Sequence, residues 1–158
     1  MPDIVIRPAL IEDAATVLAL ERSLARFLKH EANFKATLAD VERDAFGPSP
    51  RFEAWLAVVD GQPAGLLTFF PTYSTFKAKP CLFVDSLYVE EGTRGLGLGR
   101  RLMATACRLA VERGCVRVDL NVLDWNPARA FYGSLGIQET GEVALSVTGE
   151  TMRRLAEG

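Results

Sequence analysis

The fold of this chain is decided by the stretch Arg94-Gly95-Leu96-Gly97-Leu98-Gly99-Arg100, which stands between an apolar, β-prone run at 82–89 and an amphipathic pattern at 97–114. Glycines at alternate positions let the backbone approach a bound anion closely. The first N–H groups of the following helix have no partner inside that helix, and the helix dipole favours negative charge beside them. We therefore predict a strand-to-helix turn that binds phosphate or pyrophosphate.

Two well-known nucleotide-binding motifs fit this turn less well. A dinucleotide-binding fold would show G-x-G-x-x-G after its first strand, whereas the spacing here is G-x-G-x-G and a predicted hairpin precedes it. A Walker A loop would continue into Gly-Lys-Ser or Gly-Lys-Thr, and this chain does not. An isolated glycine turn often serves backbone freedom alone. Here Arg94, Arg100 and Arg101 flank the glycines, which favours an anion.

Outward from this turn, strands and helices alternate along the chain. Asp60-Gly61 predicts a tight hairpin turn, and Thr37 with Asp40 predicts the start of a short helix that ends before Gly47-Pro48. Strands joined by a hairpin and then alternating with helices predict an α/β fold with a mixed central sheet, antiparallel in its N-terminal half and flanked by helices. We expect strands at 4–7, 54–59, 64–70, 82–89, 116–122 and 141–147, and helices after Asp13, at 37–46, at 97–114, at 127–135 and within 149–158.

Length and composition limit the classes of protein that this chain can represent. Its 158 residues predict a single domain over 1–158, and 49% hydrophobic with 24% charged residues is typical of a globular protein. The formal net charge of -2 provides no general attraction for nucleic acid or an acidic membrane. Any anion site must therefore be local, and we expect no nucleic-acid partner.

The chain shows no targeting, membrane or metal signal. Met1-Pro2-Asp3 places an acid where a secretory signal carries a base, and the longest uncharged stretch, 61–76, is shorter than the ~20 apolar residues that span a bilayer. Cys81, Cys107 and Cys115 lack C-x-x-C spacing, and a single histidine leaves no set of zinc ligands. We expect a cytoplasmic protein with no metal cofactor and no membrane partner.

Together with the glycine turn, other segments resemble the GNAT superfamily of acetyl-CoA-dependent N-acetyltransferases, whose signature is Q/R-x-x-G-x-G/A. The likeness extends from about residue 4 to residue 136 and is greatest with the diamine branch, the spermidine/spermine and thialysine N-acetyltransferases. The segments that carry it are Ile6-Arg7-Pro8-Ala9, Tyr73-Ser74-Thr75-Phe76-Lys77, Leu87-Tyr88-Val89, Val122-Leu123-Asp124-Trp125-Asn126 and Phe131-Tyr132.

The resemblance implies a fold in which two central parallel strands splay apart and acetyl-CoA lies in the opening. Backbone groups of Leu87, Tyr88 and Val89 would then pair with the pantetheine arm, N–H groups at 94–100 would hold the pyrophosphate, and Asn126 would touch the cofactor from the far wall. A strand bulge near Leu87 would expose the N–H that binds the oxyanion. The resemblance also implies a homodimer and, as the acceptor, a small-molecule amine.

Transfer to an amine needs an acid and a base. An alkyl amine with a pKa near ~10.4 is protonated at neutral pH, and the departing thiolate needs a proton. Tyr132 matches the family tyrosine and is the candidate acid for sulfur. Its helical spacing with Ala128, Phe131 and Leu135 is also what a helix face packed on a core would show.

Asp85 is the candidate for recognising the amine or removing its proton. Simple strand alternation places it on one face with Phe83 and Leu87, either as a carboxylate at an apolar cleft or as an edge residue turned to solvent. An apolar setting would raise the pKa of Asp85 and make it a better base. We assign Ser86, its neighbour, to the substrate site as well.

The chain departs from the diamine branch at several positions. Asp85-Ser86 stands where the branch has Glu-Asp, Leu28 where it has an acid on the first helix, and Glu142 or a gap where it has a tryptophan. One residue fewer separates Asn126 from Tyr132. Two alternatives therefore stay open beside acetylation of a small amine: a non-catalytic module that senses acyl-CoA, and a GNAT enzyme that acts on a protein or peptide amine.

Overall fold

The computed structural model describes all residues, 1–158, and the chain forms two compact units, Met1–Asn126 and Pro127–Gly158. Short 3-10 turns occur at Ile11–Asp13, Glu31–Asn33 and Glu91–Thr93. None of the helices is both long and apolar enough to cross a membrane. The first unit contains β1 (Ile4–Pro8), α1 (Ala14–Phe27), α2 (Leu38–Phe46), β2 (Glu53–Val59), β3 (Gln62–Ser74), β4 (Lys79–Val89), α3 (Leu98–Glu112) and β5 (Val118–Leu120), and the second contains α4 (Ala128–Ser134) and α5 (Gly149–Ala156).

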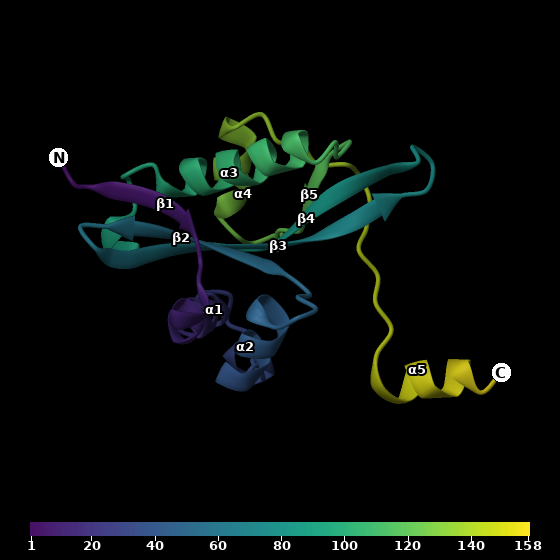
Figure 1. Cartoon of the computed structure of the whole chain (residues 1–158). Coiled ribbons are helices and arrows are strands. Elements are labelled where there is room, and N and C mark those ends of the chain that lie inside the picture. Colours follow the sequence, from purple (N-terminus) through teal and green to yellow (C-terminus); the bar gives the residue numbers. More distant parts are fainter. The chain divides into compact units, whose positions relative to one another are not determined.

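The first unit is built on one five-stranded sheet with the order β1-β2-β3-β4-β5. The first four strands are antiparallel, and β5 runs parallel to β4 (Figure 1). The hairpin between β2 and β3 turns at Asp60 (φ 49°) and Gly61 (φ 79°), the left-handed conformations that a tight hairpin requires. The predicted α/β fold with a mixed sheet, antiparallel in its N-terminal half, is confirmed.

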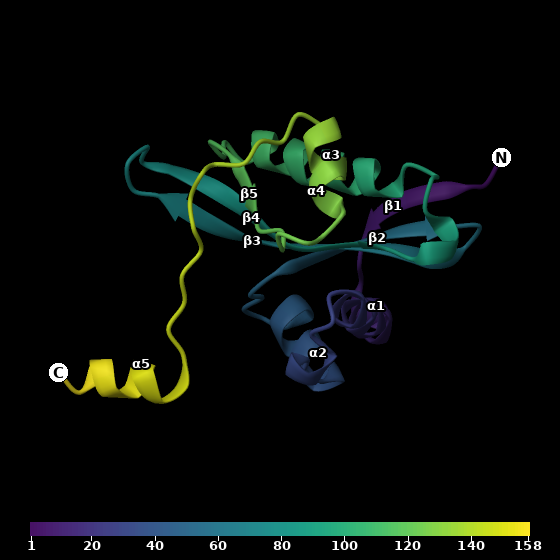
Figure 2. The same ribbon diagram turned by 180° about the vertical axis from the view of Figure 1, so that it is seen from behind.

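Helices cover both faces of this sheet (Figures 1 and 2). On one face, α3 buries Leu102 and Ala106 against Leu67 and Phe69 of β3. On the other, α1 and α2 bury apolar side chains such as Val17 against the opposite sides of β2, β3 and β4. β4 contributes Leu82 and Val84 to the first cluster and Tyr88 to the second, so apolar contacts on both faces hold it in place. Burial of each leucine or phenylalanine contributes roughly 1.5–3 kcal/mol.

The predicted helix starts have local causes that the structure confirms in part. Thr37 accepts a hydrogen bond from the Asp40 N–H, and the Asp40 carboxylate accepts one from the Thr37 N–H, so α2 begins with a capping box. Asp13 is the residue before α1, but its side chain does not cap the helix. It instead accepts hydrogen bonds from the Arg7 guanidinium and from the Leu10 N–H.

Two predicted strands differ from the structure. The strand expected at 116–122 is only Val118–Leu120, because β5 parts from β4 after three paired residues. The strand expected at 141–147 is wrong: no strand forms there, and Val143 and Leu145 are 80% and 91% exposed. Alternating apolar residues form a strand only where a neighbouring strand pairs with their N–H and C=O groups.

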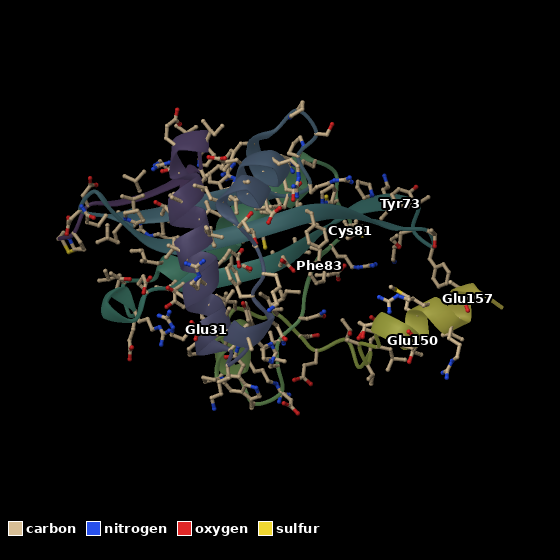
Figure 3. All side chains as sticks on the ribbon, turned by 90° about the horizontal axis from the view of Figure 1, so that it is seen from below. Glu31, Tyr73, Cys81, Phe83, Glu150 and Glu157 are labelled. Carbon is tan, nitrogen blue, oxygen red and sulfur yellow. The ribbon has the colours of Figure 1, made fainter.

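The β3–β4 hairpin extends beyond the helices that cover the sheet. In Figure 3, Tyr73 lies toward the outer end of this hairpin and Phe83 lies farther along the sheet. Tyr73 is exposed, whereas the Phe83 ring stacks on Phe70 of the neighbouring strand with 5.2 Å between the ring centroids. The hairpin thus passes from an exposed tip into the region of β4 that bears the candidate active-site residues.

Candidate active site

The two parallel strands, β4 and β5, separate at one edge of the sheet. Pairing between β4 and β5 covers only Leu82 to Val84 on β4 and Val118 to Leu120 on β5. Beyond Val84, β4 continues to Val89 paired with β3 alone. The edge of β4 that would face β5 is therefore without a strand partner along 85–89, which includes the predicted cofactor-binding residues Leu87, Tyr88 and Val89.

A β-bulge lies where this separation begins. Along β3 and β4, Thr68 pairs with Ser86 and the next residue, Phe69, pairs with Val84, so Asp85 has no partner on β3. The bulge shifts the alternation of β4 by one residue. Val84 packs on the α3 side before it, and Leu87 packs on that same side after it.

The bulge overturns the prediction that Asp85 shares a face with Phe83 and Leu87. Phe83 alternates with Val84 before the bulge, while Leu87 returns to the Val84 side after it, so Phe83 and Leu87 lie on opposite faces. Asp85 itself is exposed, but burial by its surroundings still raises the pKa of its carboxyl. The bulge thus takes Asp85 out of the regular alternation of β4. Partial burial of its carboxyl group strengthens the affinity of that group for a proton.

Ser86 is buried on the α1 side of the sheet. Its hydroxyl donates a 2.8 Å hydrogen bond to Oε2 of Glu21 on α1, and the hydroxyl of Thr68 donates to Oε1 at 3.3 Å. Desolvation raises the pKa of Glu21, the Ser86 hydrogen bond opposes this, and the negative charge of Asp85 raises it further. The side chain of Ser86 is therefore held by Glu21, a residue that the sequence analysis did not select.

One signal in the sequence marks Glu21. Val17, Leu24 and Leu28 lie on one face of a helix at spacings of seven and four residues, and Glu21 occupies the position between the first two on that face. An acid on the apolar face of a helix requires a polar partner across the interface. The sequence alone does not say which strand provides that partner.

The glycine turn has the predicted backbone geometry. Gly95 (φ 88°) and Gly97 (φ 76°) are left-handed, and α3 begins at Leu98, whose side chain is buried in the core. The N–H of Arg94 donates to the Glu91 carbonyl, whereas the N–H groups of residues 95–100, which include Leu96, Gly99 and Arg100, donate to no backbone carbonyl outside α3. This row of donors at a helix N-terminus fits a pyrophosphate.

Arginine side chains surround the turn in two ways. The Arg94 guanidinium lies over the Phe27 ring, 5.2 Å from its centroid, and its Nε donates to the Val89 carbonyl at 3.3 Å. Arg100 and Arg101 are exposed at the start of α3 and belong to no ion pair. Arg94 is therefore held by its neighbours, whereas Arg100 and Arg101 can reach an anion.

Asn126 lies at the end of the loop that follows β5. Its N–H donates to the Leu123 carbonyl at 2.9 Å, which closes a turn. The neighbouring Trp125 ring is 6.3 Å from the Phe27 ring at the end of α1, and the Lys29 ammonium is 5.2 Å from the Trp125 centroid. These contacts tie the loop before Asn126 to the first helix.

Tyr132 belongs to the second unit, Pro127–Gly158. It lies on α4, with its ring centroid 5.1 Å from that of Phe131. Burial raises the pKa of the Tyr132 phenol, so the side chain remains protonated at neutral pH. A neutral phenol can donate a proton, which is the chemistry expected of an acid for a departing thiolate.

The side chains that commonly bind metals do not come together into a metal site. No group of three or more His, Cys, Asp or Glu side chains is placed so that it could hold a metal ion. Cys81, Cys107 and Cys115 are free, and Cys81 is buried. The first unit therefore contributes backbone donors, two carboxylates and hydroxyl groups to the candidate site, and the Tyr132 phenol belongs to the second unit.

Known proteins share both the sequence and the fold of this chain. The acetyltransferase (GNAT) family model matches residues 17–137. A thialysine N-epsilon-acetyltransferase from Bos taurus is 30% identical over 169 residues, with 99% of both chains covered. Spermidine/spermine N(1)-acetyltransferase-like protein 1 from Homo sapiens is 31% identical over 134 residues, with 80% of this chain and 19% of that protein covered. An integron cassette protein from the mobile metagenome of V. cholerae has a similar fold, with a TM-score of 0.80 at 20% identity and 98% of each chain covered.

Proposed function

The chain belongs to the acetyltransferase (GNAT) family and is an acetyltransferase, and from this premise we propose that it transfers the acetyl group of acetyl-CoA to a primary amine of a small molecule. The acceptor class is a diamine, a polyamine or a thialysine-like amino acid. Relatives named for thialysine and for spermidine/spermine support this class. The transfer is direct, with no acetylated enzyme residue.

The observation that carries the proposal is the row of N–H donors at the glycine turn. The N–H groups of residues 95–100 make no backbone hydrogen bond outside α3, and Arg100 and Arg101 stand exposed beside them. These groups hold the pyrophosphate of acetyl-CoA, which the GNAT family uses. The free edge of β4 at Leu87, Tyr88 and Val89 pairs with the amide groups of the pantetheine arm, and Asn126 contacts the cofactor from the β5 side.

The amine step belongs to the bulge. Bound acetyl-CoA would supply an acetyl group activated as a thioester. Asp85 attracts the protonated amine and removes its proton, directly or through water, so that the nitrogen lone pair is free to form the C–N bond. The raised pKa of Asp85 suits this role, because a carboxylate with stronger affinity for a proton is a better base. Ser86 belongs to the same site as the residue that follows Asp85, and its hydroxyl donates to Glu21.

The leaving-group step belongs to Tyr132. As the C–N bond forms, the nitrogen releases its second proton. As the C–S bond breaks, the Tyr132 phenol donates its proton to sulfur and regains a proton, through water, from the nitrogen, while the proton on Asp85 returns to solvent. A backbone N–H freed at the bulge, near Leu87, stabilises the oxyanion. Of the two protons that the ammonium loses, one thus reaches solvent through Asp85 and one replaces the proton that Tyr132 gives to the thiolate.

The test is release of CoA thiol from acetyl-CoA in the presence of an amine panel. The panel contains diamines, polyamines, thialysine-like amino acids and short peptides. We expect thiol release and N-acetylated product with one or more of the small amines. Turnover with peptides alone would replace the proposed acceptor class by protein or peptide amines. Tight binding of CoA in calorimetry without turnover of any amine would overturn the proposal in favour of a sensor module.

We also propose that residues 1–158 act as one functional domain, which forms a homodimer in the cytoplasm. The family match at 17–137 runs across the boundary between the two compact units, which supports a single domain. The exposed apolar side chains of Val143, Leu145 and Val147 support the dimer, because a second copy would shield them from water. Sedimentation at micromolar concentration should give twice the monomer mass of 17.3 kDa, and a monomer would contradict the dimer.

A further inference from the structure

Glu21 is a carboxylate at the interface between α1 and the sheet, and no cation neutralises it. It is partly buried, and it belongs to none of the ion pairs of the structure. Its polar partners are the hydroxyl groups of Thr68 and Ser86. A carboxylate that is partly removed from water without an opposite charge costs stability. Packing alone therefore does not explain why a carboxylate occupies this position.

The two hydroxyl groups hold Glu21 at the bulge. Thr68 and Ser86 are paired residues of β3 and β4, and they are the first pair after the bulge at Asp85. Each hydroxyl donates to a different oxygen of the same carboxylate, at 3.3 Å for Thr68 and 2.8 Å for Ser86. Both residues are almost fully buried, at 2% and 5% exposure, so this contact has a defined geometry. Glu21 thus fixes the residue that directly follows Asp85.

The charge of Asp85 also acts on Glu21. Among the causes that shift the pKa of Glu21, the negative charge of Asp85 is the one that comes from another ionised group, and it raises that pKa. The raised pKa of Asp85 has burial as its cause. Three other charged or titratable groups on the elements around Glu21 have partners elsewhere. On α1, Arg22 lies over the Phe34 ring, on β4 the Tyr88 hydroxyl donates to Glu90, and on α2 Arg43 pairs with Asp40 and Asp44.

We propose that Glu21 is the positioning residue for the amine step: through its hydrogen bond to Ser86 it fixes the bulge that presents Asp85. This inference rests on the proposed function, in which Asp85 receives the proton of the amine. Glu21 itself touches neither the amine nor acetyl-CoA in this scheme. It acts from the face of the sheet that α1 covers, which is opposite to the face that α3 covers.

The first test is Glu21→Gln, which keeps the shape of the side chain and removes its charge. Gln has one carboxamide oxygen in place of two carboxylate oxygens, so the hydroxyl groups of Thr68 and Ser86 no longer each have an oxygen of their own and the bulge is held less firmly. We expect kcat to fall about 3- to 10-fold while KM for acetyl-CoA stays unchanged. Binding of CoA should stay unchanged. Glu12→Gln is the matched control, because it removes an equal charge from an exposed residue just before α1.

The second test removes the same hydrogen bond from the strand side and does not need Glu21 to be replaced. Ser86→Ala removes the hydroxyl that binds Glu21, while Ser86→Thr retains a hydroxyl. We expect kcat to fall about 3- to 10-fold in Ser86→Ala and to recover in Ser86→Thr. If Glu21→Gln does not fold, this pair decides, and equal kcat in both Ser86 variants would overturn the proposal.

The outcomes distinguish this inference from the proposed function. If Asp85→Asn loses activity while Glu21→Gln keeps the kcat of the natural protein, Glu21 has no positioning role and the proposed function stands. If Asp85→Asn retains full activity, Asp85 is not the base, and the proposed amine step fails with it. A lower kcat in Glu21→Gln at unchanged KM for acetyl-CoA, with Glu12→Gln unchanged, supports the positioning role.

Discussion

The glycine turn and the bulge follow each other along the chain, the bulge inside β4 and the turn between β4 and α3, and they are built by different means. The turn at 94–100 presents backbone N–H groups at a helix N-terminus, an arrangement that suits an anion. The bulge leaves Asp85 without a partner on β3, and the next residue, Ser86, binds Glu21 of α1. The turn depends on a short contiguous sequence, whereas the bulge brings together α1, β3 and β4. Backbone donors can thus be arranged locally, while the placement of Asp85 needs three elements to be assembled.

The largest effect is expected from replacing Asp85, the exposed acid at the bulge. Asp85→Asn removes the proposed proton acceptor and leaves a side chain of the same size, so kcat/KM for the amine should fall about 10³-fold. Steady-state kinetics with a saturating concentration of acetyl-CoA measures this, and calorimetry should show unchanged CoA binding. A variant that lost CoA binding and amine turnover to the same extent would contradict the separation of the two regions.

Tyr132→Phe should produce the next largest effect. It removes the hydroxyl that we propose donates to sulfur, and kcat should fall about 10²-fold. Because burial raises the pKa of Tyr132, the phenol ionises only at a pH above its ordinary range, and the basic limb that it controls should disappear in the variant. A pH profile of thiol release measures both effects. Tyr73→Phe, which removes a hydroxyl from an exposed tyrosine, is the control. Unchanged turnover across pH in Tyr132→Phe would remove its role as the acid.

A substitution at a left-handed glycine tests whether binding of CoA depends on the backbone geometry of the turn. Gly97 has φ 76°, a conformation that costs a side-chain-bearing residue roughly 1–2 kcal/mol, so Gly97→Ala should weaken CoA binding about tenfold. Gly92→Ala is the matched control, because a Cβ there would meet no atom within 4 Å and its φ is not left-handed. Calorimetry with CoA compares the two variants. Equal affinity would contradict the dependence of the anion site on this backbone geometry.

The smallest effect on activity should come from a contact outside both regions. Asp13→Asn removes the ion pair with Arg7, in which the two atoms Nη1 and Oδ2 lie 2.6 Å apart. We expect a loss of about 1–2 kcal/mol of unfolding free energy at neutral pH, with kcat unchanged. The Arg7 hydrogen bond lowers the pKa of Asp13. Its stabilisation is therefore present above the unfolded-state pKa and is lost as pH falls through the folded-state pKa.

Thermal unfolding at several pH values measures this contribution. The difference in Tm between the natural protein and Asp13→Asn should be largest near neutral pH and should shrink in acid. A gap that grew in acid would contradict the assigned direction. A large fall in kcat at full stability would instead connect this junction with the site.

Local patterns were predicted well because their causes lie within a few residues. The capping box of Thr37 and Asp40 and the hairpin turn at Asp60-Gly61 require only neighbouring atoms. The register of paired strands is not local. The face of Asp85 was predicted wrongly because one unpaired residue at the bulge reverses the alternation that follows. The strand expected at 141–147 failed for a similar reason, since no neighbouring strand pairs with it.

The sequence by itself determined the strand–glycine turn–helix unit at 82–112 and the likeness to acetyltransferases, because both depend on residue type and short spacing. Only the tertiary structure decided that Glu21 meets Ser86. These residues are separated by 65 positions, and their contact requires α1 to pack on one side of a sheet whose register is set by a bulge. Hydrogen bonds between side chains of distant elements depend on that packing, which no short stretch of the chain specifies.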